Sequence, residues 1–338
     1  MVQLGRMDFT MEPTGAARSA AIIFALICFG LGIAGCATET HRAAARVDRT
    51  DATAKPFVDC RGSHNLGPTV FLEAGAFSTS ADWSLILRDL ARSGRVCAYD
   101  RLGLGLSPDR SSPPTAEQIA RELAATLDQL GEAAPIILVG HSNGAFYAET
   151  FATLFPDRVA GLVYVNGVGT DDLDAPQLIS QLESERTQAD LAAVGGRLGV
   201  ARWFVDPKIA AIGLDGQGAL RKSRALTSSR FLADARDEVM EILPALRRVR
   251  ELGDVPPTIP VAVVVGALRQ APAPDEAWRA AEVAPATRAC QGWVLDAIGA
   301  SHVSPLGRDR SYVIAAVRWL KTPGLKAAAA CTDAVFKR

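Results

Sequence analysis

The sequence predicts an α/β protein whose mostly parallel sheet is flanked by helices and interrupted by a helical insertion. Apolar runs of strand length alternate with amphipathic segments between residues 57 and 325, which is typical of parallel strands joined by crossover helices. No such run occurs from about residue 170 to 254. In the stretch Val139-Gly140-His141-Ser142-Asn143-Gly144, a serine stands between two glycines where a strand gives way to a helix.

The elements follow in order along the chain. Seven runs have the composition of strands: 56–60, 69–75, 95–100, 135–140, 159–166, 259–266 and 292–299. Helical segments lie between and after them: 80–94, 116–130, 145–155 and 311–320. Thr115-Ala116-Glu117-Gln118 is a capping box, and Gly131 is a stop signal, so the second of these helices has both ends marked.

The insertion at about 170–254 is predicted to be a helical cap. Its segment 228–252 has one apolar stripe, and Pro244 predicts a kink there. We expect the cap to cover a pocket and to select the substrate. Trp203, Phe204 and Phe231 either line that pocket or form the cap's own core.

Residues 1–35 are predicted to be a lipoprotein signal peptide. The apolar run that ends at Gly35 is short for a membrane span and has the length of a signal-peptide core. Ile33-Ala34-Gly35-Cys36 resembles the bacterial lipobox, which implies cleavage before Cys36 and acylation of that cysteine, palmitate included. Ala37 resembles the signal for the periplasmic face of the outer membrane in bacteria that have one. An uncleaved signal anchor is the alternative.

Residues 36–56 would then be the lipidated cysteine and a flexible tether, because they offer few bulky apolar side chains to bury. Export would place the remaining cysteines in an oxidising compartment. These cysteines are Cys60, Cys97, Cys290 and Cys331. Three pairings are open to them, and no spacing indicates a zinc site.

Ser142 needs a base to become a nucleophile, and an imidazole serves at neutral pH. The chain has four histidines. His41 lies in the tether, His64 precedes the core strands, and His141 is on the same tight turn as Ser142 and cannot easily reach it. His302, after the last predicted strand, is therefore the expected base.

The strand, the Gly140-x-Ser142-x-Gly144 turn, the helix, the helical insertion and the late histidine together resemble the α/β-hydrolase family over nearly all of residues 57–325. The resemblance implies a mostly parallel, eight-stranded type of sheet. It also implies a serine hydrolase of carboxylic esters that passes through an acyl-enzyme, with Ser142 as nucleophile and His302 as base. The stretches "LEAG" and "DRLGLGLS" resemble a bacterial branch of the family, where the second stretch shapes a loop beside the site.

The resemblance also implies an oxyanion hole. Asn143, directly after the nucleophile, would supply one backbone N–H. Where the family commonly has a His-Gly pair, this chain has Glu73-Ala74-Gly75-Ala76-Phe77. With Gly75 as the equivalent glycine, Ala76 would supply the second N–H. An ordinary glycine turn is the alternative for this loop.

The third member of the catalytic set departs from the family pattern. The family acid usually follows the strand at 259–266, but the chain continues as Ala267-Leu268-Arg269-Gln270. Some members carry it after the strand at 159–166, where this chain has Asn166. The candidates are, in order of preference, Asp275, Glu276, and Asp171 or Asp172.

The family's strand order places the strand of Cys60 beside that of Cys97. The resemblance therefore implies a Cys60–Cys97 disulfide, which leaves Cys290–Cys331 to fix the C-terminal tail at 326–338.

Charge and motifs exclude several function classes. The formal net charge of −1 gives no electrostatic basis for nucleic-acid binding. The sequence has no metal motif, phosphate loop or dinucleotide fingerprint, so we expect no cofactor. The expected partners are a small-molecule ester and a membrane, reached through the N-terminal lipid. Two alternatives stay open: a cofactor-free lyase, perhydrolase or acyltransferase on the same fold, or a non-catalytic binding lipoprotein.

Overall fold

A single eight-stranded sheet forms the centre of the unit that extends from Asp51 to Arg338. The computed structural model describes residues 54–64, 66–174, 178–267 and 276–322, together with Cys331 and residues 335–337. The predicted signal peptide, Cys36 and most of the predicted tether lie outside the described residues.

The strands confirm the predicted sheet. They are β1 (Val58–Arg61), β2 (Val70–Glu73), β3 (Val96–Tyr99), β4 (Ile136–His141), β5 (Val159–Val165), β6 (Val261–Ala267), β7 (Gln291–Ile298) and β8 (Val335–Lys337). Their spatial order is β1-β3-β2-β4-β5-β6-β7-β8. Among the strands that the structure describes, only β1 runs antiparallel to its neighbour, β3. The sequence patterns predicted the first seven strands, and β8 comes from the segment that we predicted to be a tail.

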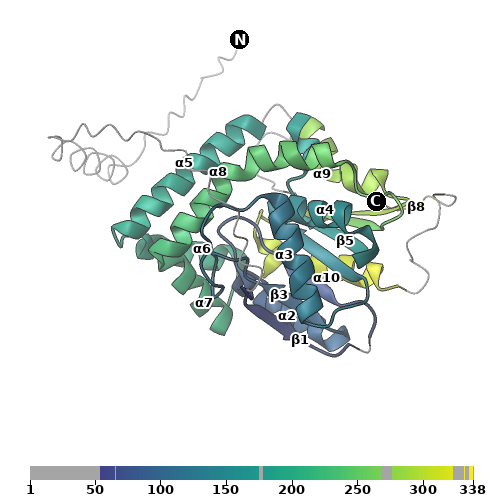
Figure 1. Ribbon diagram of the computed structural model, residues 1–338, viewed down its shortest axis with the longest axis horizontal. Coiled ribbons are helices and arrows are strands. Elements are labelled where there is room, and N and C mark those ends of the chain that lie inside the picture. Colours follow the sequence, from purple (N-terminus) through teal and green to yellow (C-terminus); the bar gives the residue numbers. More distant parts are fainter. Residues whose placement is uncertain are drawn as a thin grey trace, which may run out of the picture. The chain divides into compact units, whose positions relative to one another are not determined.

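Helices connect and cover the strands (Figure 1). The α-helices are α2 (Ser84–Leu90), α3 (Ala116–Gln129), α4 (Gly144–Leu154), α5 (Leu178–Arg197), α6 (Val205–Ile212), α7 (Gly216–Thr227), α8 (Ser229–Leu252), α9 (Glu276–Arg288) and α10 (Ser311–Leu320). Short 3₁₀ helices are η1 (Ser80–Trp83), η2 (Ala91–Ser93), η3 (Pro156–Arg158), η4 (Thr170–Asp174), η5 (Ala201–Phe204) and η6 (Ser304–Leu306). The capping box at Thr115 is present at the start of α3, as predicted.

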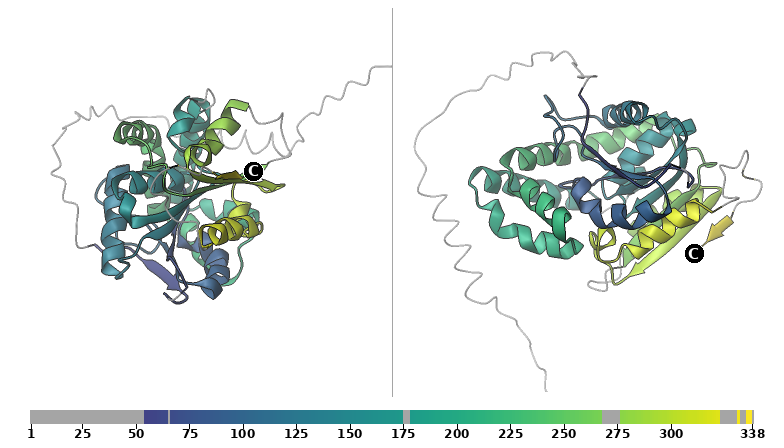
Figure 2. Two further views of the ribbon diagram at one scale, coloured as in Figure 1. Left: turned by 90° about the vertical axis from the view of Figure 1, so that its right-hand side faces the viewer. Right: turned by 90° about the horizontal axis from the view of Figure 1, so that it is seen from below.

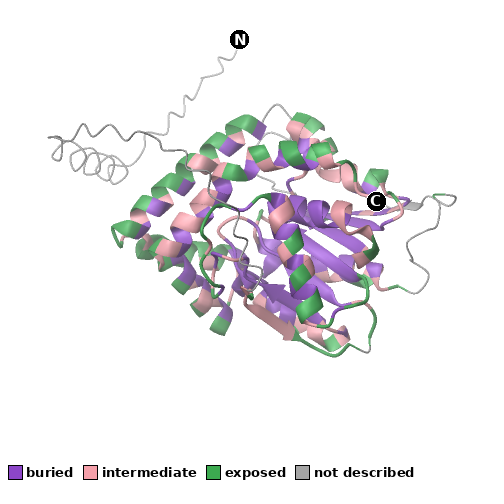
Figure 3. Ribbon diagram, viewed as in Figure 1, coloured by how far each residue is buried: buried purple, intermediate pink, exposed green. Residues whose placement is uncertain are grey.

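The sheet has two apolar faces, because successive strand residues point to opposite sides. On one face, α2 and α10 bury side chains such as Ile86 and Val317 against Val70 and Val139. On the other face, α3, α4 and α9 pack against the alternate strand residues, with Phe151 fully buried. Helices therefore lie on both sides of the sheet (Figure 2), and the strands β2 to β5 are almost entirely buried (Figure 3).

The helical cap comprises η4, α5, η5, α6, α7 and α8. Apolar residues of α8, among them Val239 and Leu246, pack with Leu182 of α5 and with Phe146 of α4, so the cap rests on the core helices. Phe231 belongs to the cap's own core and is 1% exposed. Trp203 and Phe204 are 68% and 64% exposed. Neither residue is therefore buried in the cap.

Two disulfides are present, Cys60–Cys97 and Cys290–Cys331. This is the pairing that the family resemblance implied. Cys60 and Cys97 face each other in register across β1 and β3. Within the described residues, no helix combines the length and the apolar character that crossing a bilayer requires.

Candidate active site

Ser142 lies on the tight turn between β4 and α4. Its φ of 53° places it in the left-handed region, which non-glycine residues rarely adopt. The surrounding backbone holds it there: the Ser142 N–H donates to the Val165 carbonyl at 3.1 Å, and the Ser142 carbonyl accepts from the Ala145 N–H at 2.9 Å. A strained serine that neighbouring strands fix in place is the geometry expected of an activated nucleophile.

The two flanking glycines make this turn possible. A Cβ at Gly140 would lie 2.4 Å from the Gly144 carbonyl oxygen, and a Cβ at Gly144 would lie 2.5 Å from the Glu73 carbonyl oxygen. Both are backbone atoms, which cannot give way cheaply. Any side chain at either position would therefore push α4 away from the end of the sheet.

The segment after β2, residues 74–79, lies directly beside Ser142, and we call it the oxyanion loop after its predicted role. A Cβ at Gly75 would lie 2.9 Å from the Cβ of Ser142, which shows how closely the two backbones approach. Phe77 in this loop has a φ of 54°. Asn143, at the N-cap of α4, is 4% exposed. The first N–H groups of a helix lack partners within it, so this end can receive an anion.

The backbone of the His302 loop is anchored to the ends of β4 and β5. His141 Nε2 donates to the His302 carbonyl at 2.9 Å, and Asn166 Nδ2 donates to the same oxygen at 2.9 Å. Asn166 Oδ1 accepts from the Gly266 N–H at the end of β6. Three neighbouring strands therefore hold this loop, and the His302 ring lies 4.9 Å from the His141 ring, centroid to centroid.

From the sequence, Asn166 is only a vacant acid position and His141 only a histidine that cannot easily reach Ser142. The structure gives both residues a role as anchors of the His302 loop. The only available signal was their place at the ends of adjacent strands, because carboxyl ends of parallel strands meet at one edge of a sheet.

Both imidazoles have lowered pKa values. His302 is exposed as a residue, but the protein atoms around its imidazole lower its pKa through desolvation. Burial, assisted by the nearby His302, lowers the pKa of His141 to about 3. Since a carbonyl oxygen can only accept, His141 carries its proton on Nε2. His302 is therefore able to accept a proton at neutral pH.

No hydrogen bond joins the Ser142 hydroxyl to the His302 ring among the described residues. Such bonds are often long in free enzymes and shorten when substrate binds. Asp275 lies outside the described residues, and so does the side chain of Glu276. Asp171 forms an ion pair with Arg288, and Asp172 accepts from the Gly169 N–H at 2.7 Å. Neither carboxylate contacts His302 in the described part of the chain.

The stretch 100–107 shapes its own loop, as predicted for a scaffold. Asp100 accepts from the Ser80 N–H at 2.6 Å and from the Leu106 N–H at 2.8 Å. A Cβ at Gly105 would lie 2.3 Å from the Asp100 carboxylate, so this position requires glycine. The loop, which follows β3, is thereby bonded to the start of η1.

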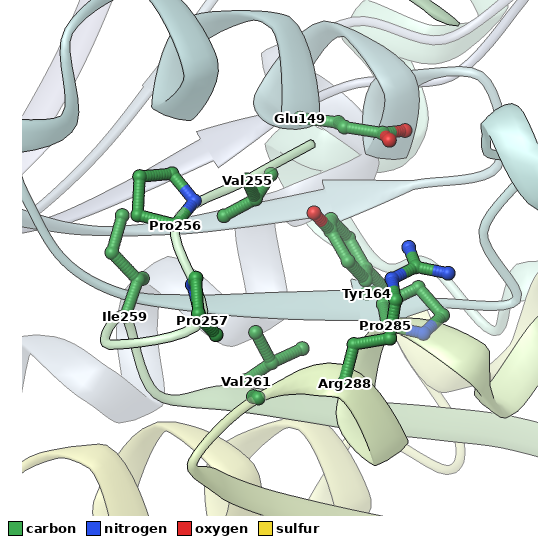
Figure 4. A pocket seen from close by; sticks show the side chains of 10 residues that line it. Glu149, Tyr164, Val255, Pro256, Pro257, Ile259, Val261, Pro285 and Arg288 are labelled. Carbon is green, nitrogen blue, oxygen red and sulfur yellow. The ribbon is translucent and has the colours of Figure 1, made fainter. Parts of the chain in front are cut away.

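A small pocket lies between α4, β5 and α9, where Tyr164 and Arg288 face it (Figure 4). An adjoining pocket shares Glu149 and Tyr164 and adds Asp172 and Glu282. Neither pocket is lined by Ser142 or His302. Among the residues that the structure describes, no group of three or more histidine, cysteine or acidic side chains could hold a metal ion.

Comparisons with known proteins identify the family and the fold. The sequence profile named "Alpha/beta hydrolase family" matches residues 70–316. Lipase LipV from Mycobacterium tuberculosis is 32% identical over 122 residues, which cover 36% of this chain and 46% of LipV. 2-Hydroxy-6-oxo-2,4-heptadienoate hydrolase from Pseudomonas putida is 35% identical over 118 residues, covering 33% of this chain and 40% of that enzyme. The chain spans less than half the length of the curated relatives that it matches.

Solved structures share the fold. Cfl2 from Burkholderia cenocepacia superposes with a TM-score of 0.62 at 18% identity, covering 78% of this chain and 92% of Cfl2. A thermophilic esterase from Thermogutta terrifontis gives a TM-score of 0.54 at 23% identity, covering 79% of this chain and 93% of the esterase. With the family profile matched over most of its length, the chain belongs to the alpha/beta hydrolase family.

Proposed function

We propose that this protein hydrolyses carboxylic esters through an acyl-enzyme on Ser142. His302 is the base, and the N–H groups of Ala76 and Asn143 stabilise the oxyanion. Asp275 is the first candidate for the acid that orients His302. Cys36 carries the lipid that anchors the chain to the periplasmic face of an outer membrane.

The reaction then follows from the roles of these groups. The Ser142 oxygen attacks the ester carbonyl while His302 takes the hydroxyl proton. The negative charge that develops on the carbonyl oxygen is met by the two backbone N–H groups. His302 passes its proton to the departing alcohol, and the acyl group stays on Ser142. Water, activated by the same imidazole, attacks the acyl-enzyme and releases the acid.

One observation carries the proposal: a serine with a φ of 53° lies beside the oxyanion loop, and its neighbour His141 contacts the loop of His302. Residues that could serve as nucleophile, base and oxyanion donors thus follow the carboxyl ends of strands in one sheet, which supports the proposal. Among the relatives, a lipase and an esterase are named for ester chemistry.

The test uses the full chain, purified in detergent and incubated with a fluorophosphonate probe. Mass spectrometry then locates the adduct. We expect the label on Ser142 alone, and its loss in Ser142→Ala and in His302→Ala, because phosphonylation needs an activated serine. Folded protein that stays unlabelled would contradict ester hydrolysis. The lipid anchor is tested separately, by the mass of the mature N-terminal peptide after expression in a Gram-negative host.

A further inference from the structure

Buried cations hold the oxyanion loop on the side of its carbonyl groups. Arg101 Nη1 donates to the Ala74 carbonyl at 2.6 Å, and Arg101 Nη2 donates to the Gly75 carbonyl at 3.3 Å. Lys222 Nζ donates to the Phe77 carbonyl at 2.7 Å. Three peptide units of this short loop therefore have their direction fixed by a charged side chain.

The direction of a carbonyl also sets the direction of the N–H that follows it. In a trans peptide unit the two groups point to opposite sides, and no cis peptide bond occurs in the described part of the chain. The Gly75 carbonyl and the Ala76 N–H belong to one unit. The Gly75 carbonyl accepts hydrogen bonds from Arg101 and, at 3.4 Å, from the Ser78 N–H, and both donors lie on the same side of the unit. The Ala76 N–H is thereby directed to the opposite side.

The cap holds both cations. Both carboxylate oxygens of Glu238 in α8 accept hydrogen bonds from Arg101, at 3.0 Å from Nε and 2.6 Å from Nη2. Glu73 of β2 completes the set at 2.6 Å from Nη1. Lys222 is itself a cap residue, in α7, and forms an ion pair with Asp82 at 2.6 Å. The side chains of Arg101, Glu73 and Glu238 are at most 5% exposed.

Arg101 keeps its charge although it is buried. Burial opposes the charge on Arg101, but the carboxylates of Glu238 and Glu73 outweigh it and raise the pKa of the guanidinium well above its usual value. A bidentate arginine–carboxylate pair shielded from water is strong and fixed in direction. Arg101 therefore cannot reorient around the loop while Glu238 stays in place.

We propose that Glu238, acting through Arg101, is a positioning residue that aims the Ala76 N–H at the reacting carbonyl oxygen, and that Lys222 supports this by fixing the Phe77 carbonyl of the same loop. The cap is then part of the catalytic machinery: when α7 and α8 move away from the core, the oxyanion hole is lost as well as the roof of the pocket. This inference rests on the proposed ester hydrolysis.

The test compares Glu238→Gln, which keeps the side-chain shape but removes the charge, with Arg236→Gln on the same helix. Arg236 forms an exposed pair with Asp190 of α5 and does not contact the oxyanion loop, so it is the matched control. The full chain is assayed with p-nitrophenyl acetate and with its thiono analogue, whose sulfur is a poor hydrogen-bond acceptor. Circular dichroism establishes that each variant is folded.

Removal of one oxyanion donor costs about 10²–10³ in kcat. For Glu238→Gln we expect at least a tenfold fall in kcat for the oxygen ester, with KM within twofold. The preference for the oxygen ester over the thiono ester should fall with it, because only the former depends strongly on the N–H donors. Arg236→Gln should keep kcat and the preference for the oxygen ester within twofold of wild type.

The outcomes separate this inference from the proposed function. If the unaltered protein does not hydrolyse the ester, or if Ser142→Ala hydrolyses it equally well, the proposed function fails. If hydrolysis depends on Ser142 but Glu238→Gln keeps kcat and the oxygen preference, the positioning role is wrong. An equal loss on both esters would also overturn it, because that result indicates a structural defect. If Glu238→Gln does not fold, Lys222→Gln gives the same comparison, with rescue expected in Lys222→Arg.

Discussion

The turn that carries Ser142 and the oxyanion loop leave the sheet side by side, but different forces hold them. β2 and β4 are parallel neighbours, with Glu73 in register with Gly140. Each segment has one non-glycine residue in the left-handed region, Ser142 at 53° and Phe77 at 54°. The Ser142 turn is fixed by backbone atoms, among them the carbonyl groups of Gly144, Glu73 and Val165, which fit only because glycines flank the serine. The oxyanion loop is fixed by side chains from β2, the 100–107 stretch and the cap.

This difference decides how each half of the site can fail. The Ser142 turn depends on sterics, so it is sensitive to a single added methyl group and insensitive to charge. The oxyanion loop depends on buried ion pairs, so it is sensitive to the loss of one charge, because the partner charge is then left without compensation in a medium of low dielectric constant.

The largest expected effect comes from removing a buried charge beside the oxyanion loop. Arg101→Met leaves Glu73 and Glu238 buried without their cation, and we expect it to lower the free energy of unfolding by about 3–5 kcal/mol. Arg236→Met removes an arginine whose side chain is 41% exposed, and should cost about 0.5 kcal/mol or less. Urea denaturation of the full chain in one detergent solution measures both. Equal losses for the two variants would show that the buried network does not stabilise the loop.

The next largest effect comes from adding a methyl group to the Ser142 turn. Gly140→Ala places a Cβ 2.4 Å from the Gly144 carbonyl oxygen, and we expect it to lower the free energy of unfolding by about 2–3 kcal/mol. Gly195→Ala is the matched control, because its Cβ would meet its nearest neighbour, Val200, at an ordinary 3.6 Å. Alanine should stabilise α5 there by about 0.5–1 kcal/mol. If Gly140→Ala lowers the free energy of unfolding and Gly195→Ala raises it in the same urea assay, the comparison is supported. A Gly140→Ala variant with unchanged stability would contradict it.

The same difference explains what the sequence could predict. Strand runs, the capping box at Thr115 and the Gly140-x-Ser142-x-Gly144 pattern are local, so seven strands and the position of the Ser142 turn follow from short segments. The Arg101–Glu238 pair joins residues 137 positions apart, and no local pattern indicates which carboxylate of a helical insertion will meet which arginine. The anchoring role of Asn166 was not predictable for the same reason, since its partners Gly266 and His302 lie 100 and 136 positions away.

The smallest expected effect concerns Asp172, which follows β5 next to the Ser142 turn. In contrast to Glu73 and Glu238, Asp172 pairs with no arginine or lysine in the described part of the chain, and its Oδ1 has no hydrogen-bond donor there. Burial raises its pKa from 3.8 to about 6. A carboxyl whose pKa is raised on folding stabilises the protein while it is protonated, and this contribution is lost as the pH rises through about 6.

Asp172→Asn removes this titration but keeps an oxygen that can accept from the Gly169 N–H. Between pH 5 and pH 8, the unaltered protein should therefore lose about 1 kcal/mol more of its unfolding free energy than the variant does. Urea denaturation at the two pH values measures the difference. An identical pH dependence in the two proteins would mean that Asp172 keeps an ordinary pKa on folding. Asp172 would then be an ordinary carboxylate. The contrast between the Ser142 turn and the oxyanion loop would rest on the Arg101 network alone.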